Sequence, residues 1–352
     1  MKFIHCADVH LGSRIDSRFP REVSERKREE VRNTFRRMVE YAKREDVCAI
    51  LLSGDVFDSD KPFKKDKEFF FSVVEGNPEI DFLYLRGNHD SEGESRELPN
   101  LKLFGEEWCA YEYDDVVISG IEIAPGNATS LYAALSLSSE KKNIVMLHGQ
   151  IGDASGVDKI NLPRLRDKHI DYLALGHVHT YASGALDARG TYAYCGCPEG
   201  RGFDEAGEKG FVLIEVSKDG VTHTFQPFCE RMIEWFSLDV TGYDSAYDVS
   251  RMAAEYITEK KSICRFELTG ELEADADELA ADVKKYLESE CFFVDVKDRT
   301  RRRIDVGAYQ NDLSLAGEFV RHVLASAAYS DEEKEQIVSL GLRALKGIEV
   351  DR

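Results

Sequence analysis

The sequence lacks several features that would define whole classes of protein. None of its apolar runs approaches the 18 residues that a membrane-spanning helix needs, and its N-terminus lacks the adjoining basic and apolar segments of a signal peptide. Its eight cysteines are scattered and form no compact disulfide framework. We therefore expect a soluble, cytoplasmic protein with reduced thiols and no membrane partner.

Basic charge is also scarce. The 352 residues contain 46 Lys and Arg against 66 Asp and Glu, which gives a net charge of −20. Such acidity is unusual for a protein that binds nucleic acid, because basic surface normally supplies most of the affinity for phosphates. Residues 1–44 are an exception, with 12 Lys and Arg against 7 Asp and Glu. At this length, two domains, or one large domain with an appendage, are expected.

Five short apolar runs each end in residues that can bind a metal ion. The runs cover residues 3–7, 49–53, 82–86, 144–147 and 172–175, and the side chains that follow them are Asp8, His10, Asp55, Asn88, His148, His177 and His179. Runs of this length and composition predict strands buried on both faces. Because chemistry collects beyond the carboxyl ends of the strands in open α/β sheets, the sequence predicts a metal centre at one sheet edge.

The kinds of side chain at this edge limit which metal ions could bind there. Imidazole, carboxylate and amide donors without a thiolate suit Mn²⁺, Fe, Zn²⁺ or Mg²⁺ rather than a closed structural zinc site. Seven donors are too many for one ion with open positions, but they fit two ions about 3.5–4 Å apart, as in hydrolases of phosphate esters. Asp55 is the expected bridge, since a carboxylate can give one oxygen to each ion.

The ordered set of motifs resembles the calcineurin-like metallophosphoesterase superfamily. The motifs are Asp8-x-His10, Gly54-Asp55-x-x-Asp58, Gly87-Asn88-His89-Asp90, His148-Gly149 and Gly176-His177-x-His179. Within the superfamily, longer matches at residues 8–12, 54–58, 147–151 and 197–205 make the chain most similar to the SbcD-type DNA double-strand-break repair nucleases. The motifs cover residues 1 to about 230, and beyond that point the similarity is one of layout.

The resemblance assigns a role to each motif residue. One ion would be held by Asp8, His10, Asp55 and His179, and the other by Asp55, Asn88, His148 and His177. His89 would protonate the leaving oxygen, a task suited to an imidazole that titrates near neutral pH, and Asp90 would orient its ring. Asp58 is expected to brace its loop. Histidines outside the motifs (His5, His169, His223 and His322) are expected to be structural, and Cys195-Gly196-Cys197 to be a tight strand exit.

The resemblance also implies cofactors, partners and activity. It implies two divalent ions, with Mn²⁺ expected and Mg²⁺, Fe or Zn²⁺ as alternatives, and 3′–5′ exonuclease and endonuclease activity on DNA. It further implies a homodimer that acts with an SbcC-type coiled-coil ATPase. Arg14, Arg18 and Arg201 are the candidates for DNA contacts.

Element patterns and the resemblance together predict a four-layer α/β/β/α sandwich over residues 1–230. A small α+β cap domain over 231–305, with possible DNA binding, and a C-terminal helical pair over 306–352 would follow. We expect an amphipathic helix at about 21–45, in which Val31, Phe35 and Met38 face the sheet, a hairpin at 110–123, a helix at 128–138 and second-sheet strands over 181–228. Residues 91–105 are expected to form a loop at the rim of the site. Ser330 and Glu333 have the spacing of a capping box. The helical pair could bind the ATPase or pack on the cap domain.

Two other functions remain open. One is a phosphatase or cyclic-nucleotide phosphodiesterase, although Asp90 stands where protein phosphatases have Glu and no Arg-Gly follows Asp55. The other is a non-catalytic scaffold of the same fold. A scaffold would be expected to have lost ligands, and none is missing from this set.

Overall fold

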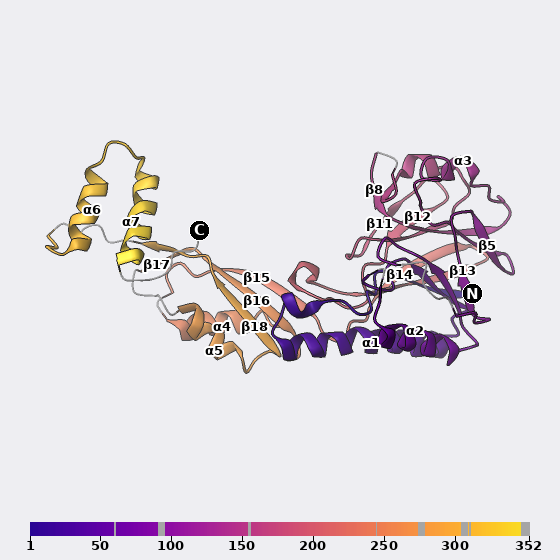
Figure 1. Cartoon of the computed structure of the whole chain (residues 1–352), viewed down its shortest axis with the longest axis horizontal. Helices are drawn as coiled ribbons and strands as arrows, with labels where there is room; N and C mark the ends of the chain where they lie inside the picture. The colour runs from indigo at the N-terminus through magenta and orange to yellow at the C-terminus, as the bar shows by residue number, and fades with distance from the viewer. Residues whose placement is uncertain are drawn as a thin grey trace. The chain divides into compact units, whose positions relative to one another are not determined.

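The computed structural model describes residues 1–59, 61–90, 96–153, 156–243, 245–273, 279–303, 309 and 311–345 (Figure 1). The chain divides into two compact units, Met1–Ile233 and Glu234–Arg352. Residues 91–95 of the expected rim loop and residues 274–278 of the expected cap domain lie outside the described residues. Within the described ranges, none of the helices has the length and apolar character that a bilayer span requires.

The first sheet of the Met1–Ile233 unit is mostly parallel and is covered on one face by two helices. Its strand order is β14 (Gly220–Pro227), β13 (Gly210–Ser217), β1 (Lys2–Cys6), β2 (Ala49–Ser53), β3 (Asp81–Leu85) and β4 (Leu101–Leu103). The helices α1 (Arg21–Arg44) and α2 (Lys64–Glu75) lie along it (Figure 1). Phe35 and Met38 of α1 pack in one core with Phe70 of α2 and Ile50 of β2, so the expected amphipathic helix and its buried face are confirmed.

The second sheet packs on the other face of the first. Its strand order is β11 (Ala182–Ala185), β12 (Thr191–Tyr194), β10 (Tyr172–Gly176), β7 (Lys142–His148), β6 (Val116–Gly120) and β5 (Cys109–Tyr113). Between the sheets, Phe3 and Leu51 share a core with Ile144 and Tyr172. The outer face packs against the short helix α3 (Leu131–Ala134) and the 3₁₀ turn Leu162–Leu165. The fold is thus the expected four-layer α/β/β/α sandwich.

Two expectations for this unit were wrong in detail. The helix expected at 128–138 is only the single turn of α3, because the serines that follow Ala134 favour backbone bonding outside helices. The strands expected in the second sheet are divided between the two sheets. β13 pairs antiparallel with β1, where its almost continuous apolar sequence is covered on both faces, and β14 follows it as a hairpin.

The other short elements of the unit flank the strand ends. They are the strands β8 (Gln150–Ile151) and β9 (Lys159–Ile160) and the 3₁₀ turns Ile15–Ser17 and Phe203–Glu205. The hairpin expected at 110–123 is present as β5 and β6. Part of the expected rim loop instead forms β4.

In the second unit, strands alternate with helices. A sheet of order β15 (Ile233–Asp239), β16 (Ile263–Thr269) and β18 (Phe293–Asp298) packs against α4 (Ala246–Ala254) and α5 (Leu279–Leu287). Phe266, Val249 and Val283 lie in its core. The parallel pair β17 (Glu271–Glu273) and β19 (Arg301–Arg303) was not expected.

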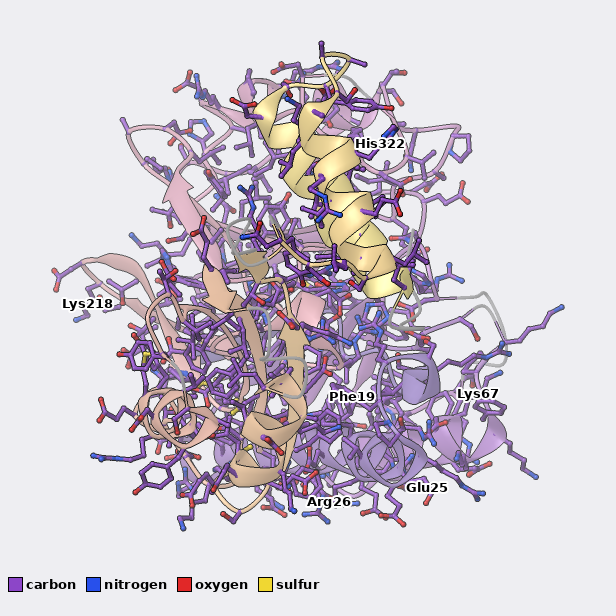
Figure 2. The ribbon with its side chains drawn as sticks, turned by 90° about the vertical axis from the view of Figure 1, so that its left-hand side faces the viewer. Phe19, Glu25, Arg26, Lys67, Lys218 and His322 are labelled. Carbon is purple, nitrogen blue, oxygen red and sulfur yellow. The ribbon has the colours of Figure 1, made fainter. Side chains whose placement is uncertain are left out.

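The C-terminal helices are α6 (Leu315–Ala325) and α7 (Asp331–Leu345). They pack through Val320, Val323 and Val338, and His322 lies on an exposed part of α6 (Figure 2). The capping box is confirmed, since Glu333 N–H donates to Ser330 Oγ at 3.3 Å and Ser330 N–H to Glu333 Oε2 at 2.8 Å. A separate third domain for this pair stays a prediction.

Candidate metal centre

The ends of strands from both sheets meet at one edge of the sandwich. Asp8 follows β1 and Asp55 follows β2, while His148 ends β7 and His177 follows β10. Asp8 N–H donates to Gly54 O at 2.9 Å and His10 N–H to Asp55 O at 3.0 Å, which fixes the two loops of the first sheet against each other. His177 N–H donates to the Asp8 carboxylate at 2.9 Å and thereby joins the second sheet to the first.

The structure brings the seven predicted donors into two adjoining groups. Asp8, His10 and His179 form one, and Asp8, Asp55 and His148 the other, with the donor atoms of each group within 4.8 Å of one another. Asn88 Oδ1 extends the second group, since it lies 3.0 Å from His148 Nε2 and 3.3 Å from His177 Nδ1.

Two carboxylates lie between the two groups. Asp55 Oδ2 is 3.4 Å from His148 Nε2 and 3.9 Å from His10 Nε2, a position suited to the bridging role expected for it. Asp8 belongs to both groups and lies 3.8 Å from His179 Nε2. Either carboxylate could therefore contribute to both ions.

Several of these residues have an unusual backbone conformation. Asp8, His10, Asp55 and His177 have positive φ angles of 53°, 49°, 52° and 99°. For residues other than glycine this left-handed conformation costs on the order of 1–2 kcal/mol each. Gly54 also has a positive φ, and a Cβ at this position would lie 2.1 Å from His148 Nδ1, so glycine is required there.

Each of three histidines contacts an acceptor through its Nδ1 atom. His148 Nδ1 lies 2.9 Å from Ser53 O, His179 Nδ1 lies 2.9 Å from Glu205 Oε1, and His10 Nδ1 lies 3.0 Å from Asp58 Oδ1. A ring that donates through Nδ1 keeps its Nε2 lone pair for a metal ion, which is the usual arrangement of metal-binding histidines. The contacts of His148 and His179 have hydrogen-bond geometry, whereas the His10 contact with Asp58 is a close contact without it. Asp58 thus contacts a candidate ligand and braces its loop.

The electrostatics of the cluster favour a cation. Asp8 and Asp55 are almost fully buried, and burial raises the pKa of Asp8 to about 6. Burial lowers the pKa of His148, but the Asp55 carboxylate raises it by more, so that the pKa rises to about 9. Burial also raises the pKa of the nearby Cys6 and Cys197 thiols, which keeps them protonated. The buried nitrogen and oxygen donors therefore fit divalent metal ions.

His89 and Asp90 occupy the turn that carries Asn88. His89 is exposed, and its ring centroid lies 5.2 Å from that of His10. The Asp90 carboxylate accepts hydrogen bonds from the N–H groups of Val56, Phe57 and Gly87. Among the described residues it makes no hydrogen bond to the His89 ring. It joins two loops instead of orienting the imidazole, which corrects the expectation drawn from the sequence.

The three arginines expected to contact DNA differ in accessibility. Arg14 and Arg18 are exposed, and Arg18 Nη1 donates to Asp204 Oδ1 at 3.0 Å. Arg201 is only 3% exposed and pairs with Glu205 and Asp58. The expected DNA contact of Arg201 is therefore withdrawn, because its guanidinium is enclosed by these carboxylates.

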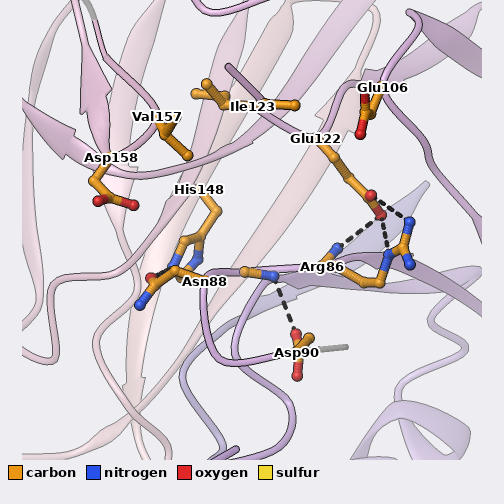
Figure 3. Close-up of a pocket in the computed structure, with 11 residues that line it drawn as sticks. Arg86, Asn88, Asp90, Glu106, Glu122, Ile123, His148, Val157 and Asp158 are labelled. Atoms are coloured by element: carbon orange, nitrogen blue, oxygen red, sulfur yellow. Dashed lines mark hydrogen bonds and ion pairs between the residues drawn. The ribbon is translucent and has the colours of Figure 1, made fainter. Parts of the chain in front are cut away.

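A pocket of about 150 Å³ shares Asn88 and His148 with the candidate metal centre (Figure 3). On its far side, Arg86 donates to both carboxylate oxygens of Glu122 at 2.8 and 2.6 Å. Glu122 also accepts the backbone N–H of Arg86 at 3.3 Å and so supports the turn that leads to Asn88. Local sequence patterns do not indicate this pair, since Arg86 follows β3 and Glu122 follows β6, 36 residues later.

The fold and this donor set define a calcineurin-like phosphoesterase. That family matches residues 1–181, and the chain belongs to it. Members of the family bind two divalent metal ions, and the two donor groups fit such a pair.

Three individual proteins that resemble this chain share 24–29% of their residues with it over the matched regions. The chain is 29% identical to the uncharacterized metallophosphoesterase YhaO of Bacillus subtilis, over 68% of this chain and 64% of that protein. It is 24% identical to the DNA double-strand break repair protein Mre11 of Sulfurisphaera tokodaii, over 97% of this chain and 93% of that protein. It is 29% identical to the Mre11 protein of Saccharolobus solfataricus, over 62% of this chain and 61% of that protein. The chain thus spans under two thirds of the first and third relatives and most of the second.

Proposed function

We propose that this chain is a two-metal-dependent DNA nuclease of double-strand-break repair, with 3′–5′ exonuclease and endonuclease activity. The observation that carries the proposal is an exposed imidazole, His89, beside seven candidate metal donors, of which all but Asn88 are buried or half-buried. The alignment with the Mre11 repair protein of Sulfurisphaera tokodaii along almost the whole chain supports DNA as the substrate.

The proposed chemistry divides between the metal ions and His89. When bound, two divalent ions neutralise charge on the phosphate oxygens and activate water. The His89 ring is open to solvent and would give its proton to the leaving oxygen. Its backbone N–H donates to Asp55 Oδ1 at 2.9 Å, which fixes the main chain that carries the ring relative to a candidate metal ligand.

DNA and partner contacts complete the proposal. Arg14 and Arg18 are exposed beyond the first metal motif and would contact the phosphate backbone. The C-terminal helices would bind an SbcC-type ATPase, since Leu313, Leu315 and Leu340 are 97%, 69% and 47% exposed. In the proposed homodimer, α1 would contribute its polar face, because its apolar face is used by the core.

The test uses a linear duplex labelled at one end, with Mn²⁺ as the added metal. Wild type should digest the duplex, EDTA should abolish digestion, and His89→Ala should lower the rate by about 10²–10⁴-fold through loss of the general acid. His322→Ala, a substitution of an exposed histidine on α6, serves as the control and should retain the wild-type rate.

A small phosphate ester separates the alternatives. If wild type leaves DNA intact but hydrolyses para-nitrophenyl phosphate, the chain is a phosphatase on the same scaffold. If neither substrate is cleaved with any of the divalent metals, it is a scaffold without catalysis. Either result overturns the nuclease proposal.

A further inference from the structure

Arg201 forms ion pairs with two carboxylates, and each carboxylate also contacts a histidine that is a candidate metal ligand. Its Nη2 lies 2.5 Å from Glu205 Oε1, and its Nη1 lies 3.0 Å from Asp58 Oδ1. Glu205 Oε1 is in turn 2.9 Å from His179 Nδ1, and Asp58 Oδ1 is 3.0 Å from His10 Nδ1. One guanidinium therefore connects to both His10 and His179 through one carboxylate each, and its Nη2 also lies 3.2 Å from His179 Nδ1.

The two histidines belong to the same donor group. His10 Nε2 and His179 Nε2 are 3.2 Å apart, and with Asp8 they form one of the two groups that could hold an ion. The second group has no such link in the part of the chain that the structure describes, since His148 is oriented by the backbone carbonyl of Ser53. A change at Arg201 should therefore act on one ion more than on the other.

We infer that Arg201 is a positioning residue that sets the orientation of His10 and His179 for one of the two metal ions. The inference rests on the metal centre of the proposed function. Arg201 and Glu205 are each 3% exposed, so their contacts are shielded from solvent. A planar guanidinium can bond two carboxylates at fixed angles, whereas a lysine ammonium cannot reproduce that fork.

The loop that carries Arg201 is itself anchored. Glu199, two residues earlier, accepts from Lys27 Nζ at 2.6 Å and from Thr34 Oγ1 at 2.7 Å, and both donors lie on α1. Arg201 N–H donates to Glu205 Oε2 at 2.8 Å and closes the loop. The backbone that carries the guanidinium is thus held in place. The guanidinium can therefore fix the positions of the two carboxylates that contact the histidines.

The experiment measures metal binding by the full chain. Metal-free wild type and Arg201→Lys are titrated with Mn²⁺ by calorimetry, and the products are examined by electron paramagnetic resonance. We expect wild type to take up two ions with an exchange-coupled signal. In Arg201→Lys, the affinity for one ion should fall about 10–100-fold, which is the usual effect of removing a residue that orients a metal ligand. The resonance signal should then become that of an isolated Mn²⁺.

Arg189→Lys is the matched control. Arg189 also makes a two-point ion pair, with Asp171 at 3.1 and 2.8 Å, but Asp171 precedes β10 at the end opposite to His177. This variant should bind two ions as wild type does. If Arg201→Lys fails to fold, Arg201→Gln takes its place, because it also removes the guanidinium fork and leaves Glu205 and Asp58 beside the histidines.

The outcomes separate this inference from the proposed function. Uptake of both ions with wild-type affinity by a folded Arg201→Lys or Arg201→Gln overturns the inference, whatever the activity on DNA. Equal weakening of both ions also overturns it. If wild type binds no Mn²⁺, both the inference and the proposed nuclease fail. If one ion is weakened selectively while wild type does not cut DNA, the inference stands and the nuclease proposal fails.

Discussion

Lys27→Met should destabilise the Met1–Ile233 unit strongly. Lys27 is fully buried on α1, with its Nζ 2.6 Å from Glu199 Oε1 and 3.1 Å from Glu30 Oε2. Arg231 Nη2 and Arg26 Nε lie 2.7 and 3.3 Å from Glu30 Oε1, so Glu30 keeps other cationic partners, whereas Lys27 is the charged partner of Glu199. Methionine keeps the aliphatic stem but leaves one buried carboxylate uncompensated. Breaking a buried pair in this way costs about 3–5 kcal/mol of unfolding free energy.

The pH dependence gives a second check on the same cluster. Burial raises the pKa of Glu30, but Lys27 and Arg231 outweigh it, so that the net pKa is lowered. Burial lowers the pKa of Lys27, but Glu199 and Glu30 outweigh it, so that the net pKa is raised. The cluster thus contributes fully between about pH 4.3 and 10.4, the ordinary values of Glu and Lys. Its contribution is lost as the pH falls through the folded pKa of Glu30 or rises through that of Lys27.

Urea unfolding followed by tryptophan fluorescence measures the effect. The chain has two tryptophans, so a Trp235→Phe background leaves Trp108 as the reporter of this unit. Lys43→Met is the control, because Lys43 pairs with Glu79 on the surface at 2.8 Å, and its midpoint should stay near that of the parent. A Lys27→Met protein within about 1 kcal/mol of the parent at pH 7 would refute the assignment of a tightly coupled buried cluster.

Three further predictions concern the metal centre and its approach. Mn²⁺ at about 100 times its Kd should stabilise the fold by about 2.7 kcal/mol, and EDTA should reverse the rise in Tm; an unchanged Tm contradicts the metal centre. Arg14→Ala should lower the slope of log K against log salt for DNA binding by about 1; an unchanged slope excludes a phosphate contact. Gly54→Ala should lower Tm and weaken Mn²⁺ binding, since the new Cβ would meet His148, whereas Gly105→Ala, with nothing within 4 Å, should bind Mn²⁺ normally.

The candidate ligands could be predicted because their positions follow from local patterns. Each is close behind a short apolar run, and such runs became parallel strands whose carboxyl ends meet at one edge. The chemistry of the side chains then indicated a metal centre without knowledge of the tertiary contacts. The face of α1 that packs on the sheet could be predicted in the same way, since helical spacing alone places Phe35 and Met38 on one side.

The roles of charged residues outside these runs could not be predicted in that way. Arg201 lies between glycines, and nothing in its local sequence indicates that Glu205 and Asp58 enclose it. Asp90 follows His89 directly, yet its carboxylate bonds to the loop after β2. The sheet to which β13 belongs was also hidden, because an apolar strand can pair with any open edge. In each case the partner lies far away in the sequence.

The left-handed backbone of Asp8, His10 and Asp55 bears on how this protein could be engineered. A search for stabilised variants favours residues that relieve backbone strain, and at positive φ these are glycine and asparagine. At His10 such a change would remove an imidazole donor, and at Asp8 or Asp55 a negative charge. Libraries selected only for thermal stability should therefore accumulate changes at these positions and yield robust proteins with an impaired site. Selection in the presence of limiting Mn²⁺ would protect them.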